Sequence, residues 1–198
     1  MVDYAQNREG AWTLLQEYVK SDTLLKHSLT VEAVMRHFAT LYNEDPDLWG
    51  NIGLLHDIDF EMYPEEHCKK TREILSAHDL SEEFIRAIES HGYGILNDIE
   101  PQSNAEKVLY TVDQLTGLIS ATALMRPSKS LYDLGAKSVR KKWKQKSFAE
   151  GVNREVIEEG AKLLGKELSE IITETIEGMK TVAEEIGLAG NIEQQTGK

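Results

Sequence analysis

The sequence has little of what marks secreted, membrane-spanning or disordered proteins. It has one cysteine, Cys68, which cannot form an internal disulfide, and this agrees with a reducing compartment. It also has no run of about 18 apolar residues that could cross a membrane as a helix. The first twelve residues, MVDYAQNREGAW, lack the basic-then-apolar pattern of a secretory signal. We therefore expect a cytoplasmic protein that does not act at a membrane.

Positive charge is scarce as well. There are 22 Lys and Arg residues against 34 Asp and Glu residues, which gives a formal net charge of −12. Because nucleic-acid affinity depends on neutralising phosphates, most of this surface would repel a nucleic-acid polymer. A small phosphate ester would need local positive charge, which a metal ion or the basic segment 137–146 could supply.

What is present suits one globular domain. The 198 residues are long enough to bury a core, and 40% of them are hydrophobic and 28% charged. Apolar residues recur at a spacing of about 3.6, whereas strand-like alternation is hard to find. We expect a single all-α domain of eight or nine helices over residues 1–188, followed by a flexible tail at 189–198.

Caps and glycines set the expected helix ends. Asp45-Pro46 is typical of a helix start, Ser81 of an N-cap, and Gly165 and Gly187 of helix stops. The expected helices cover about 8–19, 22–42, 46–57, 64–77, 81–92, 104–125, 137–144, 153–164 and 167–186. The last could pack on a second copy of the chain as readily as on its own domain, which leaves a homo-oligomer open.

Several polar residues share a helical face with apolar ones. His27, His56 and His91 each align with apolar side chains at spacings of three, four or seven residues, so they should point inward. Asp113 lies in the apolar stretch YTVDQLTGLI, and Gly117, one turn later, leaves space above its carboxylate. His67 shows the same alignment less clearly.

One metal site would explain these residues together. A single inward histidine could be a hydrogen-bonded core residue, but an ionised carboxylate such as Asp113 is costly to bury unless it is paired or metal-bound. Imidazoles and carboxylates from five helices form the ligand set of Mn, Fe, Ni, Co or Zn. We therefore predict one or two divalent transition-metal ions of open identity.

Three other candidates have plainer interpretations. The pair His78-Asp79 lies in the polar stretch SAHDLS and is interpreted as a surface turn, and His37 is expected to reach the surface. Cys68 adjoins His67, but neighbouring positions on a helix point about 100° apart. We therefore expect no catalytic dyad from these two residues.

The order of the inward residues resembles a known family. His27, then His56-Asp57, then Asp113 on a helical scaffold is similar to the signature of the HD-domain superfamily. The string LLHDID resembles its HDIG-type motif, with Asp59 where glycine usually stands. Many members have a lysine where this chain has Phe60, so no lysine contact carries over. The resemblance covers about residues 20–125 and implies a metal-dependent phosphohydrolase.

The resemblance also implies a ligand set. Members with two metals have two more histidines between the His-Asp pair and the last aspartate, and His67 and His91 occupy those places. In that arrangement Asp57 bridges the ions. The two ligand groups would then be His27, His56 and Asp113 on one metal, and His67 and His91 on the other.

The implied reaction is hydrolysis of a small phosphoester or nucleotide by a metal-activated water. Asp57 and Asp59 are the catalytic candidates, the latter to orient either the water or a ligand histidine, unless it is a plain helix-end residue. Arg126 and Lys129, and with less support Arg140, are candidates to hold the substrate phosphate. A solvated basic loop is the alternative for these three.

Other functions stay open at this point. Some HD-domain proteins hold a di-iron centre and use oxygen to cleave C–C or C–P bonds, and the ligands alone do not separate the two chemistries. A non-catalytic module that binds a metal or a nucleotide is a second alternative, and a helical scaffold without metal is a third. For a hydrolase, the substrate could be a nucleoside monophosphate, a cyclic or oligonucleotide messenger, or another small ester.

Overall fold

The protein is all-helical. The structure, a computed structural model, describes residues 4–190, and within them it contains nine α-helices, two short 3-10 helices and no β-strand. The elements are α1 Arg8–Tyr18, α2 Asp22–Tyr42, α3 Pro46–Leu55, η1 Pro64–Glu66, α4 Lys70–Ala77, α5 Glu82–Glu89, η2 Ser90–Gly92, α6 Asn104–Leu124, α7 Ala136–Trp143, α8 Arg154–Leu164 and α9 Leu168–Lys180. The predicted fold class is confirmed.

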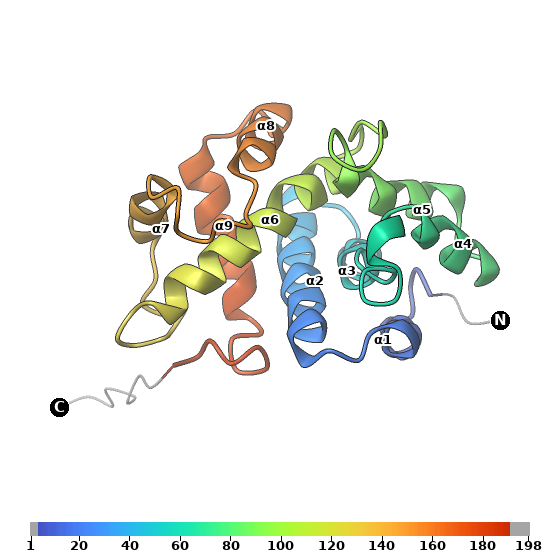
Figure 1. Cartoon of the computed structure of the whole chain (residues 1–198), viewed down its shortest axis with the longest axis horizontal. Helices are drawn as coiled ribbons and strands as arrows, with labels where there is room; N and C mark the ends of the chain where they lie inside the picture. Colours follow the sequence, from blue (N-terminus) through green and yellow to red (C-terminus); the bar gives the residue numbers. More distant parts are fainter. Residues whose placement is uncertain (1–3, 191–198) are drawn as a thin grey trace.

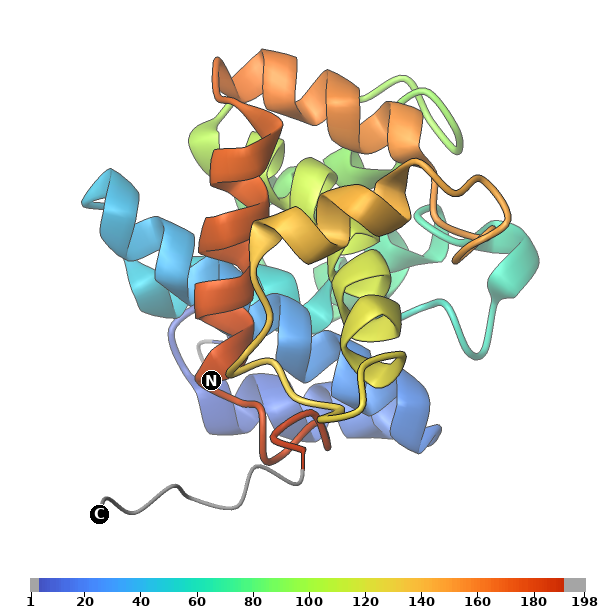
Figure 2. The ribbon, with the colours of Figure 1, turned by 90° about the vertical axis from the view of Figure 1, so that its left-hand side faces the viewer.

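Helix α2 runs through the middle of the molecule. It packs against α3, α6 and α9, and its apolar side chains Val31, Val34 and Phe38 are fully buried. Figure 1 shows α4 and α5 on one side of α2 and α7 and α9 on the other, with α6 crossing between the two groups. Seen from the side in Figure 2, α7, α8 and α9 lie nearest the viewer. This arrangement brings the N-terminal part of α2, the middle of α6 and the C-terminal end of α3 together.

Most predicted helix ends are confirmed by their caps. The Asp45 side chain accepts from the backbone N–H groups of Asp47 and Leu48, and the Ser81 hydroxyl accepts from the backbone of Phe84. Gly165 ends α8 with φ 63°, a left-handed conformation that glycine adopts without steric cost.

Four helix ends differ from the prediction, and one of them is the end of α5 at Glu89, after which the 3-10 helix η2 continues to Gly92. Helix α3 ends at Leu55, and α9 ends at Lys180 and is followed by turns up to Gly187. The stretch expected to be helical from residue 64 is only one 3-10 turn, and α4 begins at Lys70. The break matters for the site, because the residues between η1 and α4 have no helical geometry.

Helix α9 packs on its own domain, against α2, α6 and α7. No helix within residues 4–190 is long and apolar enough to cross a membrane. Of the tail predicted at 189–198, residues 191–198 lie outside the part of the chain that the structure describes.

The α2–α9 contact depends on a glycine. A Cβ atom added at Gly178 would lie 2.8 Å from the backbone Cα of Val34 and 3.2 Å from Cβ of His37. We expect Gly178→Val to lower the free energy of unfolding by about 1–3 kcal/mol, because the two helices must separate to admit the side chain. The matched control is Gly151→Val, where no atom lies within 4 Å, with an expected change within about 0.5 kcal/mol. Denaturant unfolding of both variants measures the difference, and equal midpoints would contradict this account.

Candidate metal centre

Three segments that are distant in sequence meet at the first ligand group. Helix α2 contributes His27, the end of α3 contributes His56, and α6 contributes Asp113. The Nε2 atom of His27 lies 3.0 Å from Oδ1 of Asp113 and 3.2 Å from Nε2 of His56. The His56 Nε2 atom is 3.4 Å from the same Asp113 oxygen. These atoms converge on one point, which we call the first position.

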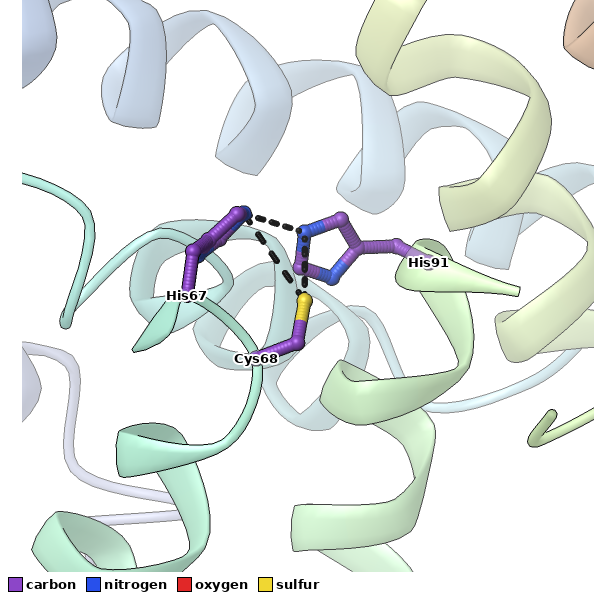
Figure 3. Close-up of side chains that lie close together, drawn as sticks. All are labelled: His67, Cys68 and His91. Carbon is purple, nitrogen blue, oxygen red and sulfur yellow. Dashed lines mark hydrogen bonds between the residues drawn. The ribbon is translucent and has the colours of Figure 1, made fainter. Parts of the chain in front are cut away.

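A second group lies beside it. The Nε2 atoms of His67 and His91 are 3.3 Å apart. The Sγ atom of Cys68 lies 3.7 Å from Nε2 of His67 and 3.6 Å from Nε2 of His91. Figure 3 shows the three side chains directed toward one another from the turn before α4 and from η2. We call this point the second position.

Asp57 lies between the two positions. Its Oδ2 atom is 3.3 Å from Nε2 of His56 and 3.6 Å from Nε2 of His27. Its Oδ1 atom is 3.4 Å from Nε2 of His67 and 3.6 Å from Nε2 of His91. The two oxygens of one carboxylate therefore face two different groups of imidazoles, as the predicted bridging role requires.

The end of α3 explains how adjacent residues reach the same centre. The helix stops at Leu55, so His56 and Asp57 occupy the turn that leaves it instead of two divergent helical positions. The His56 side chain is completely buried, while that of Asp57 keeps 14% of its surface exposed. A helix end that faces a pocket is the geometry under which both residues can ligate.

The Nδ1 atoms of three of the histidine rings, which point away from the centre, are each paired with an oxygen atom. The Nδ1 atom of His56 pairs with the carbonyl oxygen of Gly53 at 2.8 Å, and that of His91 pairs with the carbonyl of Ile88 at 2.5 Å. The Nδ1 atom of His67 pairs with Oδ1 of Asp59 at 2.7 Å. Carbonyl and carboxylate oxygens accept from N–H, so these contacts place the Nδ1 proton behind each ring and direct Nε2, the atom that could bind a metal, toward the centre.

One comparison with known proteins agrees with this geometry. Residues 24–118 match the family model described as HD domain. This segment of 95 residues, just under half of the chain, is similar to HD domains. Comparison with curated proteins found no match, and comparison with solved structures found none. The matched segment contains every residue of the two positions, and the superfamily is typically one of metal-dependent hydrolases.

Charge pairing between imidazoles and carboxylates dominates the electrostatics of the candidate metal centre. Burial by itself would lower the pKa of His56, but Asp57 and Asp113 outweigh it and raise the pKa to about 10. Burial acts in the same direction on His67, where the hydrogen bond to Asp59 is the main opposing effect and the pKa rises to about 9. Burial would raise the pKa of Asp57 and Asp113, but the neighbouring imidazoles hold both well below the usual value. Divalent cations could replace the protons that balance these carboxylates.

Cys68 is the site residue that sequence reasoning missed. The prediction treated residues 67 and 68 as helical neighbours that diverge, whereas Cys68 has φ 64° in a non-helical turn. Burial would raise the pKa of its thiol, but His91 and His67 outweigh burial and lower the pKa to about 7. The only indication of this role in the sequence was that Cys68 adjoins His67. We discounted it because we expected both residues to lie on a helix.

A cavity of about 320 Å³ opens onto both positions of the candidate metal centre. Its floor is made by five of the candidate ligands, and its walls are mainly apolar. The lining residues are Leu24, His27, Asp57, Phe60, His67, His91, Gly92, Ile95, Leu96, Asp113, Gln114, Gly117 and Val152. A neighbouring cavity of about 440 Å³ shares Leu24, His27 and Gly117 with it.

The predicted phosphate-binding residues are not brought to this cavity. Neither Arg126 nor Lys129 occurs among the described residues that line it. Arg126 lies beyond the end of α6, roughly 20 Å along the helix axis from Asp113 at 1.5 Å per residue. Its guanidinium donates to the Asp133 carboxylate at 2.7 Å. Arg140 lines a separate groove on α7. The length of α6 carries the basic segment away from the metal centre.

The contact between Asp59 and His67 can be tested by mutation. Asp59 is fully buried, so Asp59→Asn keeps its shape but removes the charge that makes the ring a better ligand. We expect metal affinity at the second position to fall about 10–100-fold. The control is Asp79→Asn, which changes an aspartate in the other His-Asp pair of the sequence. Competition with a chromophoric chelator measures both variants, and unchanged affinity in Asp59→Asn would contradict the assigned role.

Proposed function

We propose that this HD domain is a metal-dependent phosphohydrolase that acts on a small phosphoester or nucleotide through a metal-activated water. The observation that carries the proposal is the position of Asp57, whose two oxygens face separate imidazole groups at the floor of one cavity. A shared carboxylate between two nitrogen-rich groups suits a pair of divalent ions.

Each ligand has a defined part in this proposal. His27, His56 and Asp113 hold one ion, His67 and His91 hold the other, and Asp57 contacts both. When bound, the ions supply a water of lowered pKa and neutralise the charge that grows on the phosphoryl oxygens. The Nδ1 contacts behind the rings keep the Nε2 atoms directed at the centre, so that little reorganisation is needed.

Asp59 fits a positioning role better than contact with the attacking water. Its Oδ1 atom is paired with His67, and its Oδ2 atom accepts from the backbone N–H of Thr71 at 2.9 Å and from its hydroxyl at 2.8 Å. Both oxygens are therefore engaged, and the side chain is fully buried. Of the two roles expected for Asp59, orientation of a ligand histidine is the one that we propose.

The cavity favours a compact monoester as substrate. About 320 Å³ is at the low end of the roughly 300–1,000 Å³ found for small-molecule sites. Among the described residues that line it there is no lysine or arginine, so the metal ions would have to neutralise the phosphate. Phe60, Ile95 and Leu96 offer apolar surface to the organic part of the substrate, and Gln114 is a polar partner. A nucleoside monophosphate or a smaller ester suits this cavity better than an oligonucleotide messenger.

A substrate panel tests the proposal. The metal-stripped protein is reloaded with Mn, Fe, Ni, Co or Zn and assayed with p-nitrophenyl phosphate, nucleoside mono- and triphosphates, and a cyclic dinucleotide. We expect metal-dependent release of phosphate or nitrophenol, fastest with monoesters. Substrate-dependent oxygen uptake by the iron form, without phosphate release, would favour the oxygenase. Metal binding without turnover of any kind would favour a non-catalytic module.

Gly117 tests whether the cavity is the substrate site. This glycine lines both cavities, and a Cβ atom there would make only an ordinary contact, 3.6 Å from Val152. We expect Gly117→Leu to lower kcat/KM by about 100-fold through displacement of the substrate. Metal content should be unchanged, since Gly117 offers no ligand atom. Gly117→Ala is the control and should stay within a few-fold of the wild type. Equal activity of Gly117→Leu and wild type would place the substrate elsewhere.

A further inference from the structure

The thiol of Cys68 is buried against two imidazoles. The residue is 3% exposed, and its Sγ atom lies 3.6 and 3.7 Å from the Nε2 atoms of His91 and His67. Those Nε2 atoms face inward because their Nδ1 atoms are engaged behind the rings. The sulfur therefore occupies the same small space toward which two candidate metal ligands are directed (Figure 3).

The backbone is shaped to bring two neighbouring side chains to one point. Cys68 has φ 64°, in the left-handed region that residues other than glycine seldom adopt. This turn separates η1 from α4 and lets His67 and Cys68 converge, whereas a continuous helix would direct them about 100° apart. The turn is fixed on both sides by Asp59, which contacts His67 before it and Thr71 after it. A strained conformation kept by such contacts is common at functional sites.

The distances among the donors fit one tetrahedral ion. With metal–nitrogen bonds of about 2.0–2.1 Å and metal–sulfur bonds of about 2.3 Å, tetrahedral angles give about 3.3–3.4 Å between two nitrogens and about 3.5–3.6 Å between nitrogen and sulfur. The observed separations are 3.3 Å between His67 and His91, and 3.6 and 3.7 Å from these rings to Cys68. These three side chains therefore supply three donors for one ion, and Oδ1 of Asp57 lies 3.4 and 3.6 Å from the same two rings.

We propose that Cys68 is a metal ligand, so that the second position is built from two imidazoles and one thiolate beside the carboxylate of Asp57. This inference rests on the metal centre of the proposed function and adds a donor that the resemblance did not imply. The two positions then differ in chemistry, because the first has only nitrogen and oxygen donors. A thiolate favours Zn²⁺, Co²⁺ or Fe²⁺ over Mg²⁺ and Mn²⁺. The second position is expected to select the softer ion and to retain it longer against a chelator.

A buried cysteine can also be a small packing residue. A Cβ atom at Gly92 would lie 2.9 Å from Cys68 Sγ, so the glycine leaves room for the sulfur. In that account the thiol forms hydrogen bonds with the two imidazoles, and no metal is bound to the sulfur. The two accounts differ in one observable, which is a bond between sulfur and metal.

Cobalt provides that observable, because thiolate ligation gives an intense sulfur-to-cobalt absorption band in the near ultraviolet. Cys68 is the only cysteine in the chain, so such a band can come from no other residue. We expect the metal-stripped protein to develop the band when titrated with Co²⁺, and Cys68→Ser to lack it while retaining cobalt at the first position. The control His27→Gln alters only the first position and should keep the band. Absence of the band in the wild type at two bound equivalents, or its persistence in Cys68→Ser, would overturn the proposal.

A second measurement needs no variant and therefore does not depend on the folding of Cys68→Ser. We expect a thiol reagent such as iodoacetamide to modify Cys68 in the metal-stripped wild type at least about 10-fold faster than in the Zn²⁺-loaded protein, since a coordinated thiolate is held by the metal. Equal rates with and without Zn²⁺ would contradict ligation. Both readouts are independent of turnover. An inactive protein that shows the cobalt band would refute the hydrolase and support Cys68 as a ligand. An active protein without the band would support the hydrolase and refute Cys68 as a ligand.

Discussion

Asp57→Asn is expected to reduce phosphoester hydrolysis by about a thousandfold or more, equivalent to about 4 kcal/mol of lost transition-state stabilisation. Within residues 4–190, the Asp57 carboxylate lies within 3.6 Å of imidazoles in both positions. An asparagine would keep one oxygen but turn an NH₂ group toward the other position, where it cannot ligate a cation. We therefore expect loss of metal from at least one position together with loss of turnover.

The measurement pairs steady-state kinetics with elemental analysis of the purified variant. Asp79→Asn is the matched control, because it removes a carboxylate from the other His-Asp pair of the chain, in the turn after α4. Circular dichroism should show helical content equal to the wild type in both variants, since the apolar core does not include Asp57. Near-normal kcat/KM in Asp57→Asn with two bound metals would refute the bridging role and the proposed mechanism with it.

Chelation is expected to have the second largest effect. Removing the metal should reduce turnover to background and lower the thermal midpoint, and re-addition should restore both. A ligand present at a thousand times its dissociation constant stabilises the folded state by about 4 kcal/mol. For a domain of this size that corresponds to a shift of about 8–16 °C. The stripped protein should stay folded, because its buried apolar residues form one continuous cluster around α2 and α6.

Thermal unfolding with and without metal measures the shift, and the same samples are assayed for activity. Asp57→Asn serves as the internal comparison, since its midpoint should respond much less to metal than that of the wild type. An identical midpoint in both wild-type samples, with activity retained after exhaustive chelation, would show that the reaction does not depend on metal. A collapse of helical content on chelation would instead assign the metal a structural role.

Three of the six histidines were placed at the centre from helical periodicity, and His67 was added mainly through the resemblance to the HD-domain superfamily. His27 and His91 were recognised because each shares a face with apolar residues, and that face must be buried whatever the details of packing. The same reasoning separated His78-Asp79 from His56-Asp57, since only the second pair ends an apolar helix. The helix starts at Asp45 and Ser81 could also be predicted from the sequence, because a capping side chain contacts only the next few residues of the chain.

The errors have a common physical origin. Proline at residue 64 is compatible with a helix start, and nothing nearby in sequence shows that the chain turns again at Cys68. That turn is held by contacts from Asp59 to both sides of it, and one of them spans 12 residues. Arg126 was grouped with the site because it follows Asp113 in sequence, but the rigid length of α6 separates the two. In the first case contacts from another segment overrode the expected helix, and in the second the fixed geometry of a helix outweighed nearness along the chain.

The sequence by itself determined the helices, their buried faces and the residue types able to hold a metal. Local hydrogen bonding and hydrophobic periodicity act over a few residues, so they can be read without the fold. Only the tertiary structure decided that Asp57 lies between two ligand groups, that Cys68 joins one of them, and that the basic segment lies elsewhere. Those facts depend on the packing of α2, α3 and α6 and on one strained turn, and distances between segments far apart in a chain are set by packing alone.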